Sequence, residues 1–110
     1  MATSTRAKLL KGLGYSSYRA YLRSPLWSAI RRLVFAKKGS RCVLCGARAQ
    51  QVHHRRYDRS TLLGAVLTWL EPICVKCHET IEVKPNGRKR AARSVERLFR
   101  SLLKKKKAGP

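Results

Sequence analysis

Four cysteines are arranged as two pairs, each with two residues between its cysteines. The first pair is Cys42 and Cys45, and the second is Cys74 and Cys77. A turn with this spacing directs two thiolates at one tetrahedral ion, at bond lengths of about 2.3 Å. Two such pairs predict a structural zinc site with all four thiolates as ligands, in preference to two disulfides or four unrelated cysteines.

All three histidines lie within or directly beside this cysteine frame: His53, His54 and His78. Glu82 stands four residues after His78, so on a helix the two side chains share a face. Imidazole and carboxylate ligands together suit a divalent metal such as zinc, manganese or magnesium. In a strand, His53 and His54 would point to opposite faces, so that one can bind the metal while the other meets a water or the substrate.

The chain of 110 residues has 26 Lys and Arg against 5 Asp and Glu, a formal charge of +21. Self-repulsion at this density requires a counter-charge, which a nucleic-acid backbone supplies with release of its counterions. We therefore predict DNA as the partner, with RNA as the alternative. The expected nucleic-acid contacts are Arg55, Arg56, Arg88, Lys89, Arg90 and Arg93.

Two expectations concern the compartment. No run of 18 apolar residues exists, so we expect no membrane helix, and no apolar segment of a secretory signal follows the start. We therefore expect a reducing, cytoplasmic environment, in which paired cysteines bind metal. A basic start rich in Ser and Thr also suits a transit peptide, but the whole chain shares that composition.

The strongest helix signal begins at Ser24 and Pro25, which are typical of an N-cap and a first helical position. Gly39 is typical of a helix end, so we expect an amphipathic helix over residues 25–38. Its apolar face would comprise Leu26, Trp27, Ile30, Leu33 and Val34. A short helix over 15–23, with Tyr18, Tyr21 and Leu22 on one side, is expected before it. Residues 1–14 are expected to be a flexible basic arm.

Weaker signals follow the first cysteine pair. Residues 50–57 are expected to be a strand, and residues 58–72 an apolar loop or short helix interrupted by glycine and proline. We expect a helix over 75–83 that begins within the second cysteine pair. A further helix over 90–104 follows a turn at residues 85–87. Its apolar stripe comprises Ala91, Val95, Leu98, Phe99, Leu102 and Leu103.

The order of these motifs resembles that of the zinc-bearing HNH endonucleases. The resemblance is carried by residues 21–27 (YLRSPLW), 42–45 (CVLC), 53–57 (HHRRY) and 73–81 (ICVKCHETI). It implies a small zinc-stabilised ββα-metal finger of the α+β class with flanking N-terminal and C-terminal helices. We accordingly divide the chain into a basic arm (1–17), the zinc-bound HNH-like domain (18–84) and a basic C-terminal helix with a lysine tail (85–110).

The resemblance also implies roles for the histidines. His54 matches the general base that activates water, His53 and His78 match ligands of a catalytic divalent metal, and Glu82 stands where many members have a further ligand. The implied activity is metal-dependent hydrolysis of DNA phosphodiester bonds by a bacterial or phage-encoded endonuclease. The second metal would be magnesium, manganese, nickel or zinc.

One departure from the motif leaves alternatives open. Trp69 stands about where the family has its middle asparagine, and Asp58 and Glu71 are the nearby polar residues that could orient the base. The first alternative is a catalytically inactive zinc finger of the same fold that binds DNA or ribosomal RNA. The second is a subunit of a larger phage or mobile-element complex.

Overall fold

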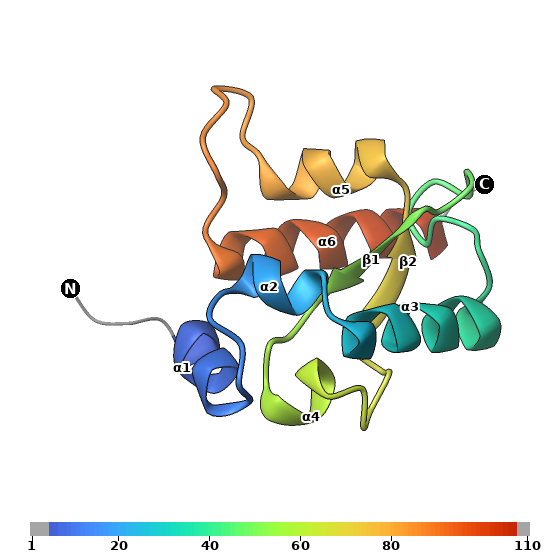
Figure 1. The fold of residues 1–110 in the computed structure, drawn as a ribbon. Coiled ribbons are helices and arrows are strands. Elements are labelled where there is room, and N and C mark those ends of the chain that lie inside the picture. The colour runs from blue at the N-terminus through green and yellow to red at the C-terminus, as the bar shows by residue number, and fades with distance from the viewer. Residues whose placement is uncertain (1–4, 108–110) are drawn as a thin grey trace.

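The computed structural model describes residues 5–107, which form six helices and a two-stranded antiparallel sheet (Figure 1). The strands are β1 (Gln51–His54) and β2 (Leu70–Ile73). The helices are α1 (Thr5–Gly12), α2 (Tyr18–Leu22), α3 (Pro25–Lys38), α4 (Arg59–Leu62), α5 (Val75–Glu82) and α6 (Ala92–Lys107). The predicted α+β class is confirmed. None of these described helices is long and apolar enough to cross a membrane.

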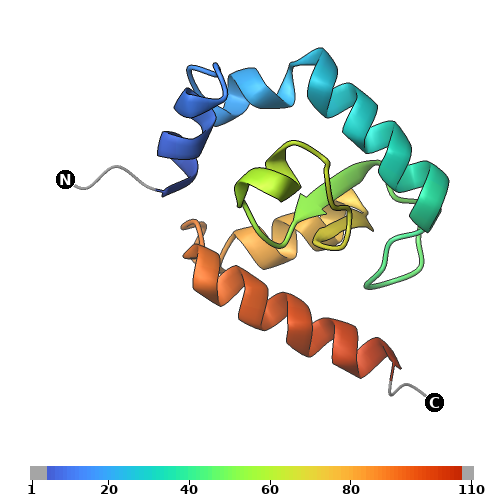
Figure 2. The ribbon, with the colours of Figure 1, turned by 90° about the horizontal axis from the view of Figure 1, so that it is seen from below.

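The sheet separates two small cores. Its register pairs Val52 with Pro72 and His54 with Leu70, so these four side chains share one face. Val52 and Leu70 pack there in a core with α3. Ile73 belongs to the opposite face and packs in a second core with α5 and α6. The sheet thus lies between α3 on one side and α6 on the other (Figure 2).

Strand β2 is a feature that the local sequence pattern did not predict. The loop or short helix expected over residues 58–72 resolves into α4 and, after a further loop, into β2. Pro72 lacks an N–H, but in a two-stranded sheet each strand has a free edge, where proline is tolerated. Its carbonyl accepts a hydrogen bond from Val43 N at 3.0 Å, which joins β2 to the first cysteine turn.

Helix α3 has the predicted bounds. Ser24 Oγ accepts a hydrogen bond from Trp27 N at 3.2 Å, which satisfies one free N–H group of the first turn. Gly39 ends the helix with φ of 85°, a conformation that glycine adopts at no steric cost. Trp27, Ile30 and Val34 are buried, as expected, but Leu33 is 47% exposed and does not join the core.

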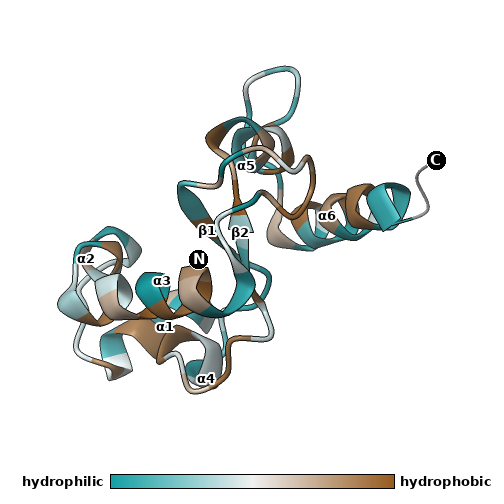
Figure 3. Ribbon diagram, turned by 90° about the vertical axis from the view of Figure 1, so that its right-hand side faces the viewer, coloured by the Kyte–Doolittle hydropathy of each residue, from teal (hydrophilic) through white to brown (hydrophobic). Residues whose placement is uncertain are grey.

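Helix α6 follows most of its predicted pattern, but it begins at Ala92 and extends to Lys107, so Ala91 of the expected apolar stripe is exposed and lies before the helix. Val95 and Phe99 are buried against Ile73 and Ile81, while the basic residues face outward. Figure 3 shows the resulting alternation of apolar and hydrophilic segments along α6. The helix therefore presents an exposed basic face while its apolar face covers the second core.

The N-terminal arm is where the structure corrects the sequence analysis most clearly. Residues 5–12 of the expected flexible arm form α1, and Leu10 is buried at 1% exposure against Tyr21 and its neighbours. Residues 1–4 of that arm and residues 108–110 of the tail lie outside the described residues. In α2, Tyr21 is fully buried but Leu22 is 38% exposed, so Leu22 does not share the tyrosine face.

Candidate functional site

The two cysteine turns bring their sulfur atoms together. The four Sγ atoms lie within 4.8 Å of one another, and the Cys45 and Cys74 sulfurs are 3.6 Å apart. Tetrahedral zinc with bonds of about 2.3 Å separates its sulfur ligands by about 3.8 Å. The predicted cysteine set is therefore one cluster that could hold a zinc ion.

Local structure explains how this cluster is built. Cys74 is the N-cap of α5, and its Sγ accepts a hydrogen bond from Cys77 N at 3.3 Å. Burial raises the pKa of Cys42, but hydrogen bonds from nearby backbone N–H groups outweigh burial and lower that pKa to about 7. The lowered pKa of Cys42 favours loss of its proton, which zinc binding requires.

A second cluster of ligand atoms comprises His53, His78 and Glu82, again within 4.8 Å of one another. Glu82 Oε1 lies 3.4 Å from His78 Nε2 and 3.8 Å from His53 Nδ1. His78 and Glu82 share one face of α5, as their spacing predicts, and His53 reaches them from β1. The predicted ligands of the divalent metal therefore lie close together.

The chemistry of this donor set fits a divalent metal. His53 is 1% exposed, and neither of its ring nitrogens has a hydrogen-bond partner among the described residues. Burial lowers its pKa to about 4, so the imidazole is neutral, the form that binds metals. His78 Nδ1 lies 2.7 Å from Gln51 Oε1. Because an amide oxygen only accepts, Nδ1 carries the proton and the Nε2 lone pair faces the cluster.

His54 lies on the other face of β1, as the strand period predicts. Its ring stacks on Trp27 at 4.5 Å between centroids and on Tyr57 at 5.2 Å, and only 3% of the residue is exposed. Its Nδ1 is 3.0 Å from the Tyr18 hydroxyl and its Nε2 is 3.5 Å from the Tyr21 hydroxyl. Burial lowers its pKa to about 3, so this imidazole is also neutral.

The hydrogen bonds around His54 indicate which nitrogen carries the proton. The Tyr21 hydroxyl donates to the Leu62 carbonyl at 2.7 Å, so toward His54 it can only accept. Nε2 is then the protonated nitrogen. The lone pair on Nδ1 remains, and it accepts from the Tyr18 hydroxyl.

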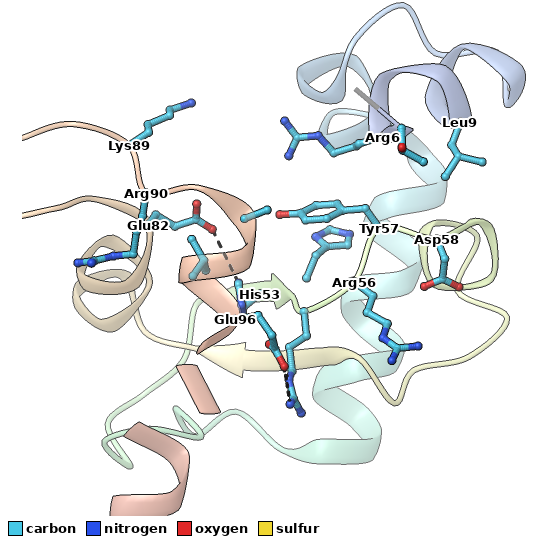
Figure 4. Close-up of a pocket in the computed structure, with 15 residues that line it drawn as sticks. Arg6, Leu9, His53, Arg56, Tyr57, Asp58, Glu82, Lys89, Arg90 and Glu96 are labelled. Carbon is cyan, nitrogen blue, oxygen red and sulfur yellow. Dashed lines mark hydrogen bonds and ion pairs between the residues drawn. The ribbon is translucent and has the colours of Figure 1, made fainter. Parts of the chain in front are cut away.

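A pocket of about 680 Å³ is lined by side chains from both faces of β1 (Figure 4). His53, His54 and Glu82 line it, together with Arg6 from α1 and Lys89 from the α5–α6 loop. The cysteine cluster does not line this pocket. The fold thus places His53, Glu82 and His54 at one cavity with several basic side chains, apart from the candidate zinc site.

The predicted nucleic-acid contacts occupy different positions. Arg55 is only 15% exposed, and its guanidinium pairs with Glu96 at 2.9 Å and Glu71 at 3.4 Å. Arg55 also lines the pocket, so its phosphate contact stays a prediction beside this internal pairing. Arg56, Lys89 and Arg90 line the pocket, whereas Arg88 and Arg93 lie outside it.

The residues near the expected asparagine position also have other partners. Trp69 lies under the Arg56 guanidinium, 4.0 Å from the ring centroid. Glu71 pairs with Lys38 and Arg55, and Asp58 accepts a hydrogen bond from Thr61 Oγ1 at 2.7 Å. The side chains that contact the ring nitrogens of His54 are two tyrosines of α2.

Four residues around the site were not predicted to take part in it. Gln51 contacts His78, Tyr18 and Tyr21 contact His54, and Arg6 lines the pocket. The i, i+3 spacing of the tyrosines did predict a shared face, but a helix face alone does not reveal what it packs against.

Comparisons of the chain with protein-family models, curated sequences and solved structures find no match.

Proposed function

We propose that this protein is a metal-dependent endonuclease of the HNH type that hydrolyses DNA phosphodiester bonds. In this proposal β1, β2 and α5 form the ββα-metal finger, and the four cysteines hold its structural zinc. The observation that carries the proposal is the cluster of His53, His78 and Glu82, two members of which, His53 and Glu82, line a pocket together with His54. A structural zinc site does not need a second cluster of imidazole and carboxylate ligands beside a cavity.

The donor atoms of each residue indicate the role that we propose for it. His53, His78 and Glu82 would hold a divalent metal, which stabilises charge on the phosphate and on the leaving oxygen. His54 is the proposed general base, and its Nδ1 carries the lone pair that accepts a proton from water. The Tyr18 hydroxyl contacts this nitrogen at 3.0 Å, so it must yield the position to water during the reaction. Arg56 and Lys89 attract the phosphate backbone.

The direct test is cleavage of supercoiled plasmid by zinc-loaded protein. Magnesium, manganese, nickel and zinc are each added in turn, with a reaction lacking added metal as the control. We expect nicked or linear product with at least one of these ions. No cleavage with any of them would refute the nuclease proposal.

The burial of His54 favours one other function, a catalytically inactive nucleic-acid-binding protein of the same fold. The stacked rings of Trp27 and Tyr57 leave this histidine 3% exposed, as expected of a core residue. A binding protein would cut nothing under the conditions above. Its affinity for nucleic acid would also be unaffected by alanine at each of the three histidines.

A further inference from the structure

Arg6 reaches the pocket from a segment with no predicted part in the site. Its guanidinium carbon lies 4.4 Å from the ring centroid of Tyr18 and 4.9 Å from that of Tyr57. Figure 4 shows its side chain extending from α1 over Tyr57, with Glu82 and Lys89 across the pocket. Tyr18 and Tyr57, which both contact His54, thus also hold this arginine.

The two rings hold the Arg6 guanidinium at cation–π distance. Their planes lie at 79° to one another, so the planar group cannot stack flat on both. The Tyr57 hydroxyl is one hydrogen-bond neighbour of Arg6, and a guanidinium carries five N–H donors in all. No carboxylate lies within 4.0 Å of Arg6 among residues 5–107.

The other arginines of the pocket are engaged within the protein. Arg55 pairs with Glu96 and Glu71. Arg90 donates to the carbonyls of Ile81 and Val83 at 3.2 and 3.4 Å, and Arg56 lies on Trp69. Arg6 is held by two aromatic rings and, like Arg56 and Arg90, has no carboxylate within 4.0 Å among the described residues.

We propose that Arg6 is a phosphate-binding residue that holds a backbone phosphate of DNA against the histidine cluster. The identity of the ligand rests on the proposed function, whereas the anion site itself rests on the geometry of Arg6. A planar guanidinium donates two parallel hydrogen bonds to phosphate oxygens, and a guanidinium fixed beforehand loses little freedom when it does so. Helix α1 thereby becomes a wall of the binding site.

The test measures binding of a 16-base-pair DNA duplex to zinc-loaded protein without a second added metal. Wild type is compared with Arg6→Gln and Arg6→Lys. Lys8→Gln is the matched control, because Lys8 is an exposed residue of the same helix and its replacement removes the same charge. Each variant is checked for its zinc content and its circular dichroism before binding is measured.

We expect Arg6→Gln to weaken binding about tenfold or more, and Lys8→Gln by less than about threefold. The slope of log affinity against log salt should fall by about 0.9 in Arg6→Gln, because one phosphate contact is lost. Arg6→Lys should keep most of the salt dependence but recover affinity only in part, since an ammonium cannot donate in the same planar fork. A purely structural arginine would change stability without this change of slope.

The outcomes separate this inference from the nuclease proposal. Equal affinities of Arg6→Gln and Lys8→Gln would overturn the role of Arg6, even if wild type cleaves plasmid. A selective loss in Arg6→Gln would support it, even if wild type cleaves nothing.

Discussion

The Arg55 guanidinium lies 2.9 Å from the Glu96 carboxylate and joins the residue directly after β1 to α6, across 41 positions of the chain. A second contact to Glu71, at 3.4 Å, extends the link to β2. Both side chains of the closer pair are mostly buried, at 15% and 29% exposure. The pair therefore holds the C-terminal helix against the sheet, close to the histidine cluster.

Glu96→Ala should lower the free energy of unfolding by about 1–2 kcal/mol, because a partly buried, charge-assisted hydrogen bond is lost. Urea unfolding followed by circular dichroism measures the change. Glu79→Ala is the control, since Glu79 is an exposed carboxylate with no ion pair among the described residues, and it should cost less than about 0.5 kcal/mol. Equal losses in both variants would contradict an anchoring role for the Arg55–Glu96 pair.

Cys74→Ser should unfold the domain, because Cys74 is both a candidate zinc ligand and the N-cap of α5. Elemental analysis of wild type after extensive buffer exchange should find about one zinc per chain. The same analysis and a circular dichroism spectrum are then recorded on the variant. Folded wild type that contains no zinc would refute the structural site.

Gln51→Ala should weaken binding of a second divalent metal about 10- to 100-fold, because the amide oxygen orients the His78 ring. Titration of zinc-loaded protein with manganese or cobalt measures this affinity. Gln50→Ala is the matched control, since the exposed neighbouring glutamine contacts Arg31 only through its backbone carbonyl. If both variants bind the metal as wild type does, Gln51 does not position a ligand.

His54→Ala should reduce cleavage about 10²- to 10⁴-fold and leave DNA affinity nearly unchanged, because a general base acts on water. His53→Ala and His78→Ala should lose both cleavage and the second metal, since each removes a ligand. Plasmid cleavage, duplex binding and metal titration distinguish the three variants. Full activity of His54→Ala in an active wild-type background would place the base elsewhere, with Glu71 as the first candidate.

The outer face of α6 carries Arg93, Arg97, Arg100, Lys104 and Lys107 at alternating spacings of four and three residues, which align them along the helix. All five are exposed. Replacing Arg97, Arg100 and Lys104 by Gln should lower the slope of log DNA affinity against log salt by about 2.7, at about 0.9 for each phosphate contact.

The matched control for this α6 variant removes three exposed charges from α2 and α3, as Arg19→Gln, Arg32→Gln and Lys37→Gln. Its slope should fall by less than about 1, because α3 lies on the opposite side of the sheet (Figure 2). Equal slopes in the two variants would show that only net charge matters.

The sequence by itself determined the features that depend on near neighbours. A Cys-x2-Cys turn needs only its own residues to direct two thiolates together, and the second pair sits at the start of a helix whose cap is one of the cysteines. Helices α3 and α6 follow from caps and apolar periodicity for the same reason. The opposite directions of His53 and His54 follow from the strand period alone.

Only the tertiary structure decided which distant groups meet. Strand β2 exists because its backbone pairs with β1, and its own residues, with Pro72 among them, do not signal a strand. The stacking of Trp27 on His54, the pairing of Arg55 with Glu96, and the position of Arg6 at the pocket all join segments far apart in the chain. Such contacts depend on the summed packing of two cores, which no local spacing of residues encodes.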